Sequence, residues 1–184
     1  MKILKGIDQK LKLKINKCIA LLGSEYTSLN FNIEPYETRE KLEFERINCP
    51  DLTDESYEDI LNGKRTIGGV TLKDKKRIKI FLYQYPNLHL PKEVLDLVAI
   101  FYHELRHAWQ IKNNMFQEND AKVISPNENF ELYFGDEAEK DAYLFHEEQI
   151  RKHTDQIFKI FEFNIPEGTM LYSLNSDIRK RFID

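Results

Sequence analysis

The first third of the chain combines two patterns of hydrophobic and polar residues. Over residues 3–22 the apolar side chains recur every three or four positions, which predicts an amphipathic helix. Residues 29–36 instead alternate apolar with polar positions, as a strand with one buried face does. Residues 37–64 are acidic and irregular, with a short helix expected over residues 54–61. The pattern therefore predicts a helix, a strand and a largely irregular segment.

In the middle of the chain, the residue pattern predicts a β-hairpin followed by a long helix. Residues 66–72 and 77–85 are rich in β-branched and aromatic side chains, and the polar stretch 73–76 between them suits a turn. A helix is expected over residues 91–112. Its first residue is a proline, which is favoured at the first position of a helix. Residues 113–129 are polar and are expected to form a loop.

A last long helix is expected to begin near Asp136 and to reach Phe163. Asp136 suits the N-cap, and Glu139 stands three positions later, where a capping box places its second residue. The helix should therefore start within a residue or two of Asp136.

Length and composition agree with one folded domain. The chain has 184 residues, of which 41% are hydrophobic and 32% are charged, which is typical of a globular protein. The order of helix, strands, helix and helix predicts an α+β domain over residues 1–184. Residues 66–163 would form its core, and residues 1–64 would add the first helix and an irregular elaboration.

Charge and hydropathy restrict the expected partners. The net charge of -4 is mild and the basic residues are dispersed, so we expect neither nucleic acid nor a membrane as a partner. Lysines interrupt the first 20 residues, which therefore lack the apolar centre of a signal peptide. Cys18 and Cys49 have no CxxC spacing, and we expect two reduced, partly buried thiols. These features predict a cytoplasmic protein.

The sequence HELRH, residues 103–107, has the spacing of a catalytic zinc site. Residues four apart share one face of a helix, so His103 and His107 can both offer an imidazole nitrogen to one Zn²⁺. Glu104 is one step further round and can take a proton from a water held at the metal. The five letters can also arise by chance in a chain this rich in charged residues.

The helix that carries HELRH is apolar over more than half of its circumference, so it should lie at the centre of the fold. Burying two imidazoles and a carboxylate without partners is costly, and a metal would satisfy them. The apolar positions are Val94, Leu97, Val98, Ile100, Phe101, Leu105, Ala108 and Trp109.

A third ligand is expected from the start of the last helix, where the sequence reads EAEKD. Glu137 and Asp141 are four apart and share a face, so Glu137 can complete a His/His/Glu site. Asp141 can then accept a hydrogen bond from the ring N–H of a liganding histidine. Glu139 is the rival third ligand, because the phase of a helix is uncertain at its first turn. The small Ala138 and Ala142 would let the two helices pack closely.

The pair HELRH and EAEKD resembles the gluzincin metallopeptidases, which carry HExxH on one helix and ExxxD on the next. The likeness covers roughly residues 66–145 and extends to the minigluzincins and the cytosolic ImmA/IrrE-like peptidases. It implies a small, twisted, mainly antiparallel sheet packed against the two helices. In those families an edge strand of this sheet pairs with an extended peptide substrate.

By this resemblance, His103, His107 and Glu137 would bind Zn²⁺. Glu104 would be the general base, and Asp141 would orient a ligand from outside the coordination sphere. Those families often add a residue that stabilises the oxyanion, and this chain offers Tyr102, Tyr143 and His146 as alternatives.

Several other residues receive structural interpretations. His89 is expected to be a packed or surface residue, and His146 and His153 are expected to face solvent on the last helix. Gly68 and Gly69, inside a strand pattern, indicate either a bulge or the close approach of a substrate backbone.

Three functional hypotheses follow. The first is a zinc-dependent metallopeptidase that hydrolyses a protein or peptide substrate, with Glu104 activating water. The second is a zinc-binding protein of the same fold that binds a partner or regulates and has little or no peptidase activity. The third is a domain that binds no metal.

Overall fold

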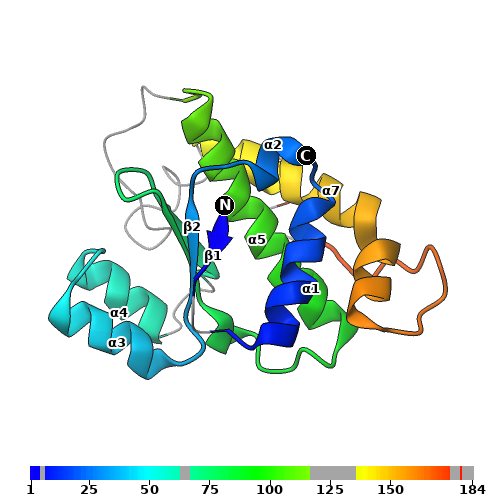
Figure 1. Ribbon diagram of the computed structural model, residues 1–184, viewed down its shortest axis with the longest axis horizontal. Coiled ribbons are helices and arrows are strands. Elements are labelled where there is room, and N and C mark those ends of the chain that lie inside the picture. Colours follow the sequence, from blue (N-terminus) through cyan, green and yellow to red (C-terminus); the bar gives the residue numbers. More distant parts are fainter. Residues whose placement is uncertain (5–6, 63–66, 117–135, 175–178, 180–184) are drawn as a thin grey trace.

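The computed structural model describes residues 1–4, 7–62, 67–116, 136–174 and 179. Figure 1 shows the long helix α5 through the middle of the molecule, with the sheet on one side of it and α1 and α7 on the other. The elements in chain order are β1 (Lys2–Ile3), α1 (Gln9–Ala20), α2 (Ser24–Thr27), β2 (Asn32–Pro35), α3 (Arg39–Asn48), α4 (Asp54–Asn62), β3 (Gly69–Leu72), β4 (Arg77–Ile80), the 3₁₀ helix η1 (Leu82–Gln84), α5 (Pro91–Lys112) and α7 (Glu137–Phe161).

The sheet is mixed, which corrects the expectation of a mainly antiparallel one. Its strand order is β1-β2-β4-β3. The predicted hairpin is confirmed, because β3 and β4 are antiparallel neighbours with Thr71 opposite Ile78. However, β2 runs parallel to both β1 and β4. Helices separate each of these parallel pairs along the chain, as a crossover between parallel strands requires.

The two faces of the sheet have different partners. Ile33, Ile78 and Ile80 belong to the main core, which the sheet shares with α1, α5 and α7. Phe81 and Val70 belong to a smaller core under α3 and α4. Because successive side chains of a strand point to opposite faces, the segment 39–62 covers the face that α5 leaves open (Figure 1).

A buried ion-pair network joins this covering segment to β4. Lys79 is 0% exposed, and its Nζ lies 2.5 Å from Oε2 of Glu45 and 3.1 Å from Oδ2 of Asp51. The hydroxyls of Tyr36 and Tyr57 also donate to Glu45. A buried lysine is costly unless it is paired, so these carboxylates hold α3 and the loop before α4 against the sheet.

The structure also corrects several boundaries. The first helix begins at Gln9 instead of residue 3, because Lys2–Ile3 pairs with β2 as a short strand. Helix α3 lies in the segment that was expected to be irregular. Helix α5 has the expected bounds. Most of the loop expected over residues 113–129 lies outside the described residues.

The two cysteines are free thiols, Cys18 buried and Cys49 exposed, so the expected partial burial holds for neither. Among the described residues, no helix combines the length and the apolar character needed to cross a membrane.

Candidate metal centre

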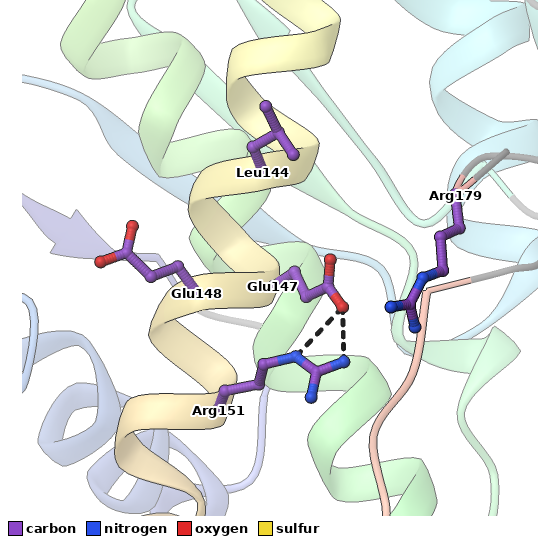
Figure 2. A pocket seen from close by; sticks show the side chains of 5 residues that line it. All are labelled: Leu144, Glu147, Glu148, Arg151 and Arg179. Carbon is purple, nitrogen blue, oxygen red and sulfur yellow. Dashed lines mark hydrogen bonds and ion pairs between the residues drawn. The ribbon is translucent and has the colours of Figure 1, made fainter. Parts of the chain in front are cut away.

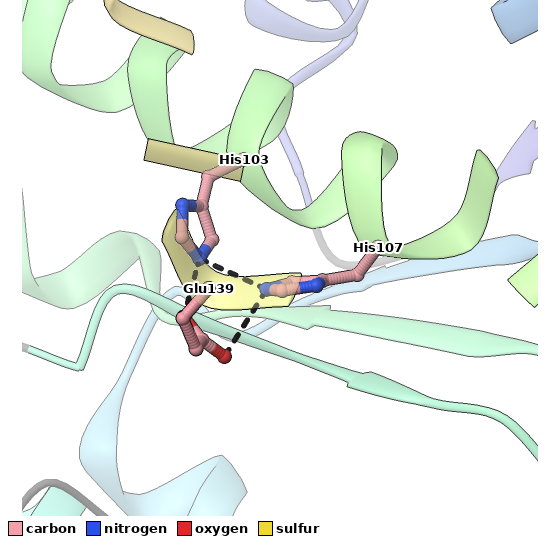
Figure 3. A group of neighbouring side chains, drawn as sticks. All are labelled: His103, His107 and Glu139. Carbon is pink, nitrogen blue, oxygen red and sulfur yellow. Dashed lines mark hydrogen bonds and ion pairs between the residues drawn. The ribbon is translucent and has the colours of Figure 1, made fainter. Parts of the chain in front are cut away.

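Three side chains converge where α5 and α7 pack against each other. His103 and His107 come from α5, and Glu139 comes from the first turn of α7 (Figure 3). The two Nε2 atoms are 3.0 Å apart. The carboxylate of Glu139 lies 3.2 Å from Nε2 of His103 through Oε2 and 3.3 Å from Nε2 of His107 through Oε1.

These separations fit a tetrahedral metal ion. Ligand atoms about 2.0 Å from a tetrahedral Zn²⁺ are about 3.3 Å from one another, which is close to the three separations of 3.0–3.3 Å. Oε2 of Glu139 is buried and lacks a hydrogen-bond partner among the described residues. Two imidazoles and one carboxylate are also a donor set that zinc prefers. The residues present therefore fit the ion.

Glu139, and not the predicted Glu137, lies beside the two histidines. Glu137 is the first residue of α7 and is exposed. The side chain of Asp136 caps α7 at the amide of Ala138, which confirms the predicted N-cap. Because residues two apart point to nearly opposite sides of a helix, only one of the two glutamates can face α5. Glu139 does so instead of closing the predicted capping box.

Charge at the cluster shifts two pKa values in opposite directions. Burial alone would lower the pKa of His107, but the nearby Glu139 and Glu104 raise it to about 9. Burial alone would raise the pKa of Glu139, but the two histidines hold it well below its usual value. Without a cation at the site, a proton on His107 compensates the carboxylate of Glu139.

Glu104 points from α5 toward the sheet. Its carboxylate oxygen Oε2 accepts a hydrogen bond of 2.8 Å from the hydroxyl of Thr71, which also lies 3.0 Å from the Glu104 carbonyl oxygen. Burial raises the pKa of Glu104, while His103, His107 and Thr71 oppose the shift. A buried carboxylate with a raised pKa, next to two metal-binding histidines, is suited to accept a proton.

The glycine pair of the sequence makes room for α5. A Cβ on Gly69 would lie 2.7 Å from Cγ of Glu104, and one on Gly68 would lie 2.6 Å from Ile100. Such distances are too short for real side chains, so the glycines are required by contact between the strand and α5. This is a third explanation, beside the expected bulge and the expected approach of a substrate.

Each histidine of the cluster has a partner at its other ring nitrogen. Nδ1 of His107 is 2.9 Å from Oε1 of Gln110. The amide nitrogen of Gln110 in turn donates to Asp141 at 2.7 Å and to the carbonyl oxygen of Ala138 at 2.9 Å. Because both of these partners are acceptors, Oε1 of Gln110 faces the ring and accepts a hydrogen bond from Nδ1–H of His107. Nε2 faces Glu139 and would bind a cation after it gives up its proton.

Asp141 acts through its neighbours and not, as expected, directly on a histidine. It accepts two hydrogen bonds from the guanidinium of Arg106, at 2.7 and 3.0 Å. Arg106 also donates to the hydroxyl of Tyr26. Asp141 therefore orients Gln110 and ties α7 to α5 and α2 at the same time.

His146 contradicts the prediction that it faces solvent. It is 2% exposed, its Nδ1 lies 3.3 Å from Nδ1 of His103, and its Nε2 lies 2.8 Å from the hydroxyl of Tyr172. Burial, and then the nearby His103, lower the pKa of His146 well below its usual value, so the ring is neutral. The sequence signal was its position seven residues, or two turns, after Glu139. His153, seven residues further on, is buried as well.

The structure separates the alternatives for an oxyanion-stabilising residue. The hydroxyl of Tyr102 donates to the carbonyl oxygen of Cys18, away from the cluster. His146 is already held between His103 and Tyr172. The ring of Tyr143 lies against His103, with centroids 4.6 Å apart, so it is the alternative that best fits the site.

Two other groups of charged side chains among the described residues are weaker candidates for a functional site. The carboxylates of Glu34, Glu45 and Asp51 lie close together, but the ammonium of Lys79 already pairs with them. A pocket, whose lining side chains are drawn in Figure 2, contains an ion pair of 2.7 Å between Glu147 and Arg151. It is lined by Leu144, Glu147, Glu148, Arg151 and Arg179, none of which was a predicted site residue.

Comparison with known proteins gives no significant match to a family model, a curated protein or a solved structure. The resemblance to gluzincins therefore rests on the sequence motifs of this chain alone.

Proposed function

We propose that this protein is a zinc-dependent metallopeptidase in which His103, His107 and Glu139 hold the metal. The observation that carries the proposal is the convergence of two Nε2 atoms and one carboxylate at 3.0–3.3 Å, with Glu104 beside them. When bound, Zn²⁺ supplies a Lewis acid for the scissile carbonyl and lowers the pKa of a coordinated water toward about 7.

In this proposal, Glu104 accepts a proton from the attacking water and passes it to the leaving amine. Its raised pKa and its hydrogen bond to Thr71 support that role. Tyr143, packed against His103, is the best-placed residue to stabilise the oxyanion.

An extended peptide is the substrate that best suits this arrangement. Strand β3 is at the edge of the sheet among the described residues, and Thr71 on that strand contacts Glu104. A peptide that pairs with β3 would therefore run past the general base. The resemblance to gluzincins likewise implies that an extended peptide pairs with the edge strand.

A first experiment tests the metal. Protein purified without chelators should contain close to one zinc per chain, and the His103→Ala variant should contain little. Less than about 0.2 zinc per chain, unchanged by His103→Ala, would contradict the metal claim.

A second experiment tests hydrolysis. A library of peptides is incubated with the protein, and new peptide termini are identified by mass spectrometry. The wild type should generate new termini, whereas Glu104→Gln should generate none above background while it retains its zinc. If the zinc-loaded wild type and Glu104→Gln give the same background, the proposed peptidase is wrong.

That second outcome would favour a partner-binding or regulatory zinc protein. One observation fits this alternative: Phe44 and Ile47, three residues apart on α3, are 66% and 78% exposed. Large apolar side chains exposed side by side are common at sites of protein contact.

A further inference from the structure

We propose that His146 and Tyr172 are positioning residues, which hold the ring of His103 so that its Nε2 faces the metal. The inference rests on the proposed metal centre, because it concerns the orientation of one of the ligands. It gives a role to a buried histidine on α7 and to a tyrosine of the segment that follows α7.

The geometry forms a chain of three side chains. Nδ1 of His103 lies 3.3 Å from Nδ1 of His146, and Nε2 of His146 lies 2.8 Å from the hydroxyl of Tyr172. His103, His146 and Tyr172 are 5%, 2% and 7% exposed, so little water can compete for these contacts. The chain starts at the proposed metal centre and ends in the C-terminal segment.

A metal at Nε2 of His103 would allow only one direction of hydrogen bonding through this chain. A neutral imidazole has one N–H donor and one acceptor nitrogen. If Nε2 of His103 binds a metal, its proton is on Nδ1 and is donated to Nδ1 of His146. His146 then carries its own proton on Nε2 and donates it to the oxygen of Tyr172.

The opposite arrangement would be unfavourable. With a proton on Nδ1 of both rings, two N–H groups would face each other at 3.3 Å. A buried donor without an acceptor is costly, so His103 would have to rotate or move its proton to Nε2. Either change would remove Nε2 from metal binding.

The two proposed histidine ligands are thus oriented in the same way by different residues. Gln110 accepts from His107 and is itself held by Asp141. His146 serves His103 in the same way and is held by Tyr172. Partners that fix the orientation of a liganding histidine typically contribute about 10–100-fold to metal affinity.

The test is zinc affinity, measured by competition with a chromogenic chelator. His146→Phe fills similar space without a ring nitrogen and should weaken zinc binding about 10–100-fold. Tyr172→Phe removes only the hydroxyl and should weaken it about fivefold. His146→Asn places an amide oxygen near the position of Nδ1 and should bind zinc within about threefold of wild type.

His153→Phe is the matched control. His153 is buried on α7 two turns after His146 and belongs to no described contact with a proposed ligand. Its replacement by phenylalanine should leave zinc affinity unchanged. Circular dichroism of each zinc-loaded variant verifies that the protein is folded.

A spectroscopic measurement separates positioning from packing. In zinc-loaded wild type, two-bond ¹H–¹⁵N spectra should show a proton on Nδ1 of His103 and the metal on Nε2. In zinc-loaded His146→Phe, the Nδ1 proton of His103 should exchange with water much faster, because it has lost its acceptor.

The outcomes distinguish this inference from the proposed function. A wild type that binds no zinc contradicts the metal centre itself. A wild type that binds zinc, with equal affinity in His146→Phe, overturns the positioning role and leaves the metal centre standing. Equal weakening in His146→Phe and His146→Asn would show that only packing matters, and it would also overturn the inference.

Discussion

Oε1 of Glu139 lies 3.3 Å from Nε2 of His107, across the contact between α7 and α5. Glu139 is the third residue of α7, so the start of that helix, fixed by the Asp136 cap, decides which glutamate reaches the site. A shift of the helix start would present a different acidic residue to the histidines.

The first prediction concerns the identity of the third ligand. Glu139→Gln should weaken zinc binding by at least about 100-fold, because an amide carries no charge and is a poor zinc ligand. Glu137→Gln, two residues earlier on the same turn, is the control and should bind zinc like the wild type. Isothermal titration or chelator competition measures both affinities, and the reverse order of effects would restore Glu137 as the ligand.

The second prediction concerns the contact between Gly69 and Glu104. Gly69→Ala would place a Cβ 2.7 Å from Cγ of Glu104 and 3.0 Å from the carbonyl oxygen of Lys79. The carboxylate must therefore move, and the cleavage rate should fall by about 100-fold while zinc content stays near one per chain.

The control for this variant is Gly168→Ala. Gly168 has a φ of +78° and nothing within 4 Å of a Cβ, so alanine there should cost about 1–2 kcal/mol of stability through backbone strain alone. It should leave the rate of peptide cleavage unchanged. If Gly69→Ala and Gly168→Ala alter the rate equally, the effect reflects stability and not the position of Glu104.

The third prediction is a pH dependence of stability that originates at His153. Burial, and then Lys152, lower its pKa, and neither ring nitrogen has a hydrogen-bond partner within the described part of the chain. In the unfolded chain this histidine binds a proton near pH 6.5, whereas in the folded chain its lowered pKa makes it bind that proton only at a lower pH. The unfolded state thus binds more protons, and the free energy of unfolding should fall as the pH drops below about 6.5.

Urea unfolding between pH 7.5 and about 5.5 measures this effect. His153→Phe should lose stability less steeply than the wild type as the pH falls, because it removes one such group. The exposed His89 supplies the control, and His89→Gln should follow the wild-type curve. Parallel curves for wild type and His153→Phe would contradict the prediction.

The fourth prediction concerns the buried network at Lys79. Lys79→Met would leave the buried carboxylate of Glu45 without its counter-charge, whereas Asp51 would keep its pairs with Lys75 and Arg77. The loss of the buried pair should lower the free energy of unfolding by about 3–5 kcal/mol. Arg77→Met removes a half-exposed pair with Asp51 and should cost about 0–1 kcal/mol. Urea titrations measure both losses.

A second substitution tests the origin of that loss. In the Lys79→Met/Glu45→Gln double variant, no carboxylate remains at Glu45, so part of the stability should return. The two residues would act independently if the losses were additive. In that case the double variant would be less stable than Lys79→Met by the same amount that Glu45→Gln alone destabilises the wild type.

Local sequence patterns were enough for the elements that carry the site. The apolar periodicity and the proline of residues 91–112 gave the bounds of α5, and the short polar stretch 73–76 predicted the β3–β4 hairpin. HELRH placed His103 and His107 on one face, because the helical repeat alone determines that relation. Asp136 likewise capped α7 through contacts within one turn.

Contacts between distant segments were not encoded in any local pattern. The parallel pairing of β2 with β1 and β4 joins strands that are far apart in sequence. Helix α3 was missed because its stabilising contacts, such as the ion pair between Glu45 and Lys79, come from the sheet. A single-sequence pattern contains no direct information on which distant segment will cover an element.

The sequence by itself determined that α5 carries two histidines and a glutamate within five residues, and that an acidic helix start follows. Only the tertiary structure decided that Glu139, and not Glu137, meets them, and that His146 and Tyr172 lie behind His103. The physical reason is that backbone hydrogen bonds fix the spacing within a helix. The rotation of α7 against α5, in contrast, depends on which side chains pack between the two helices.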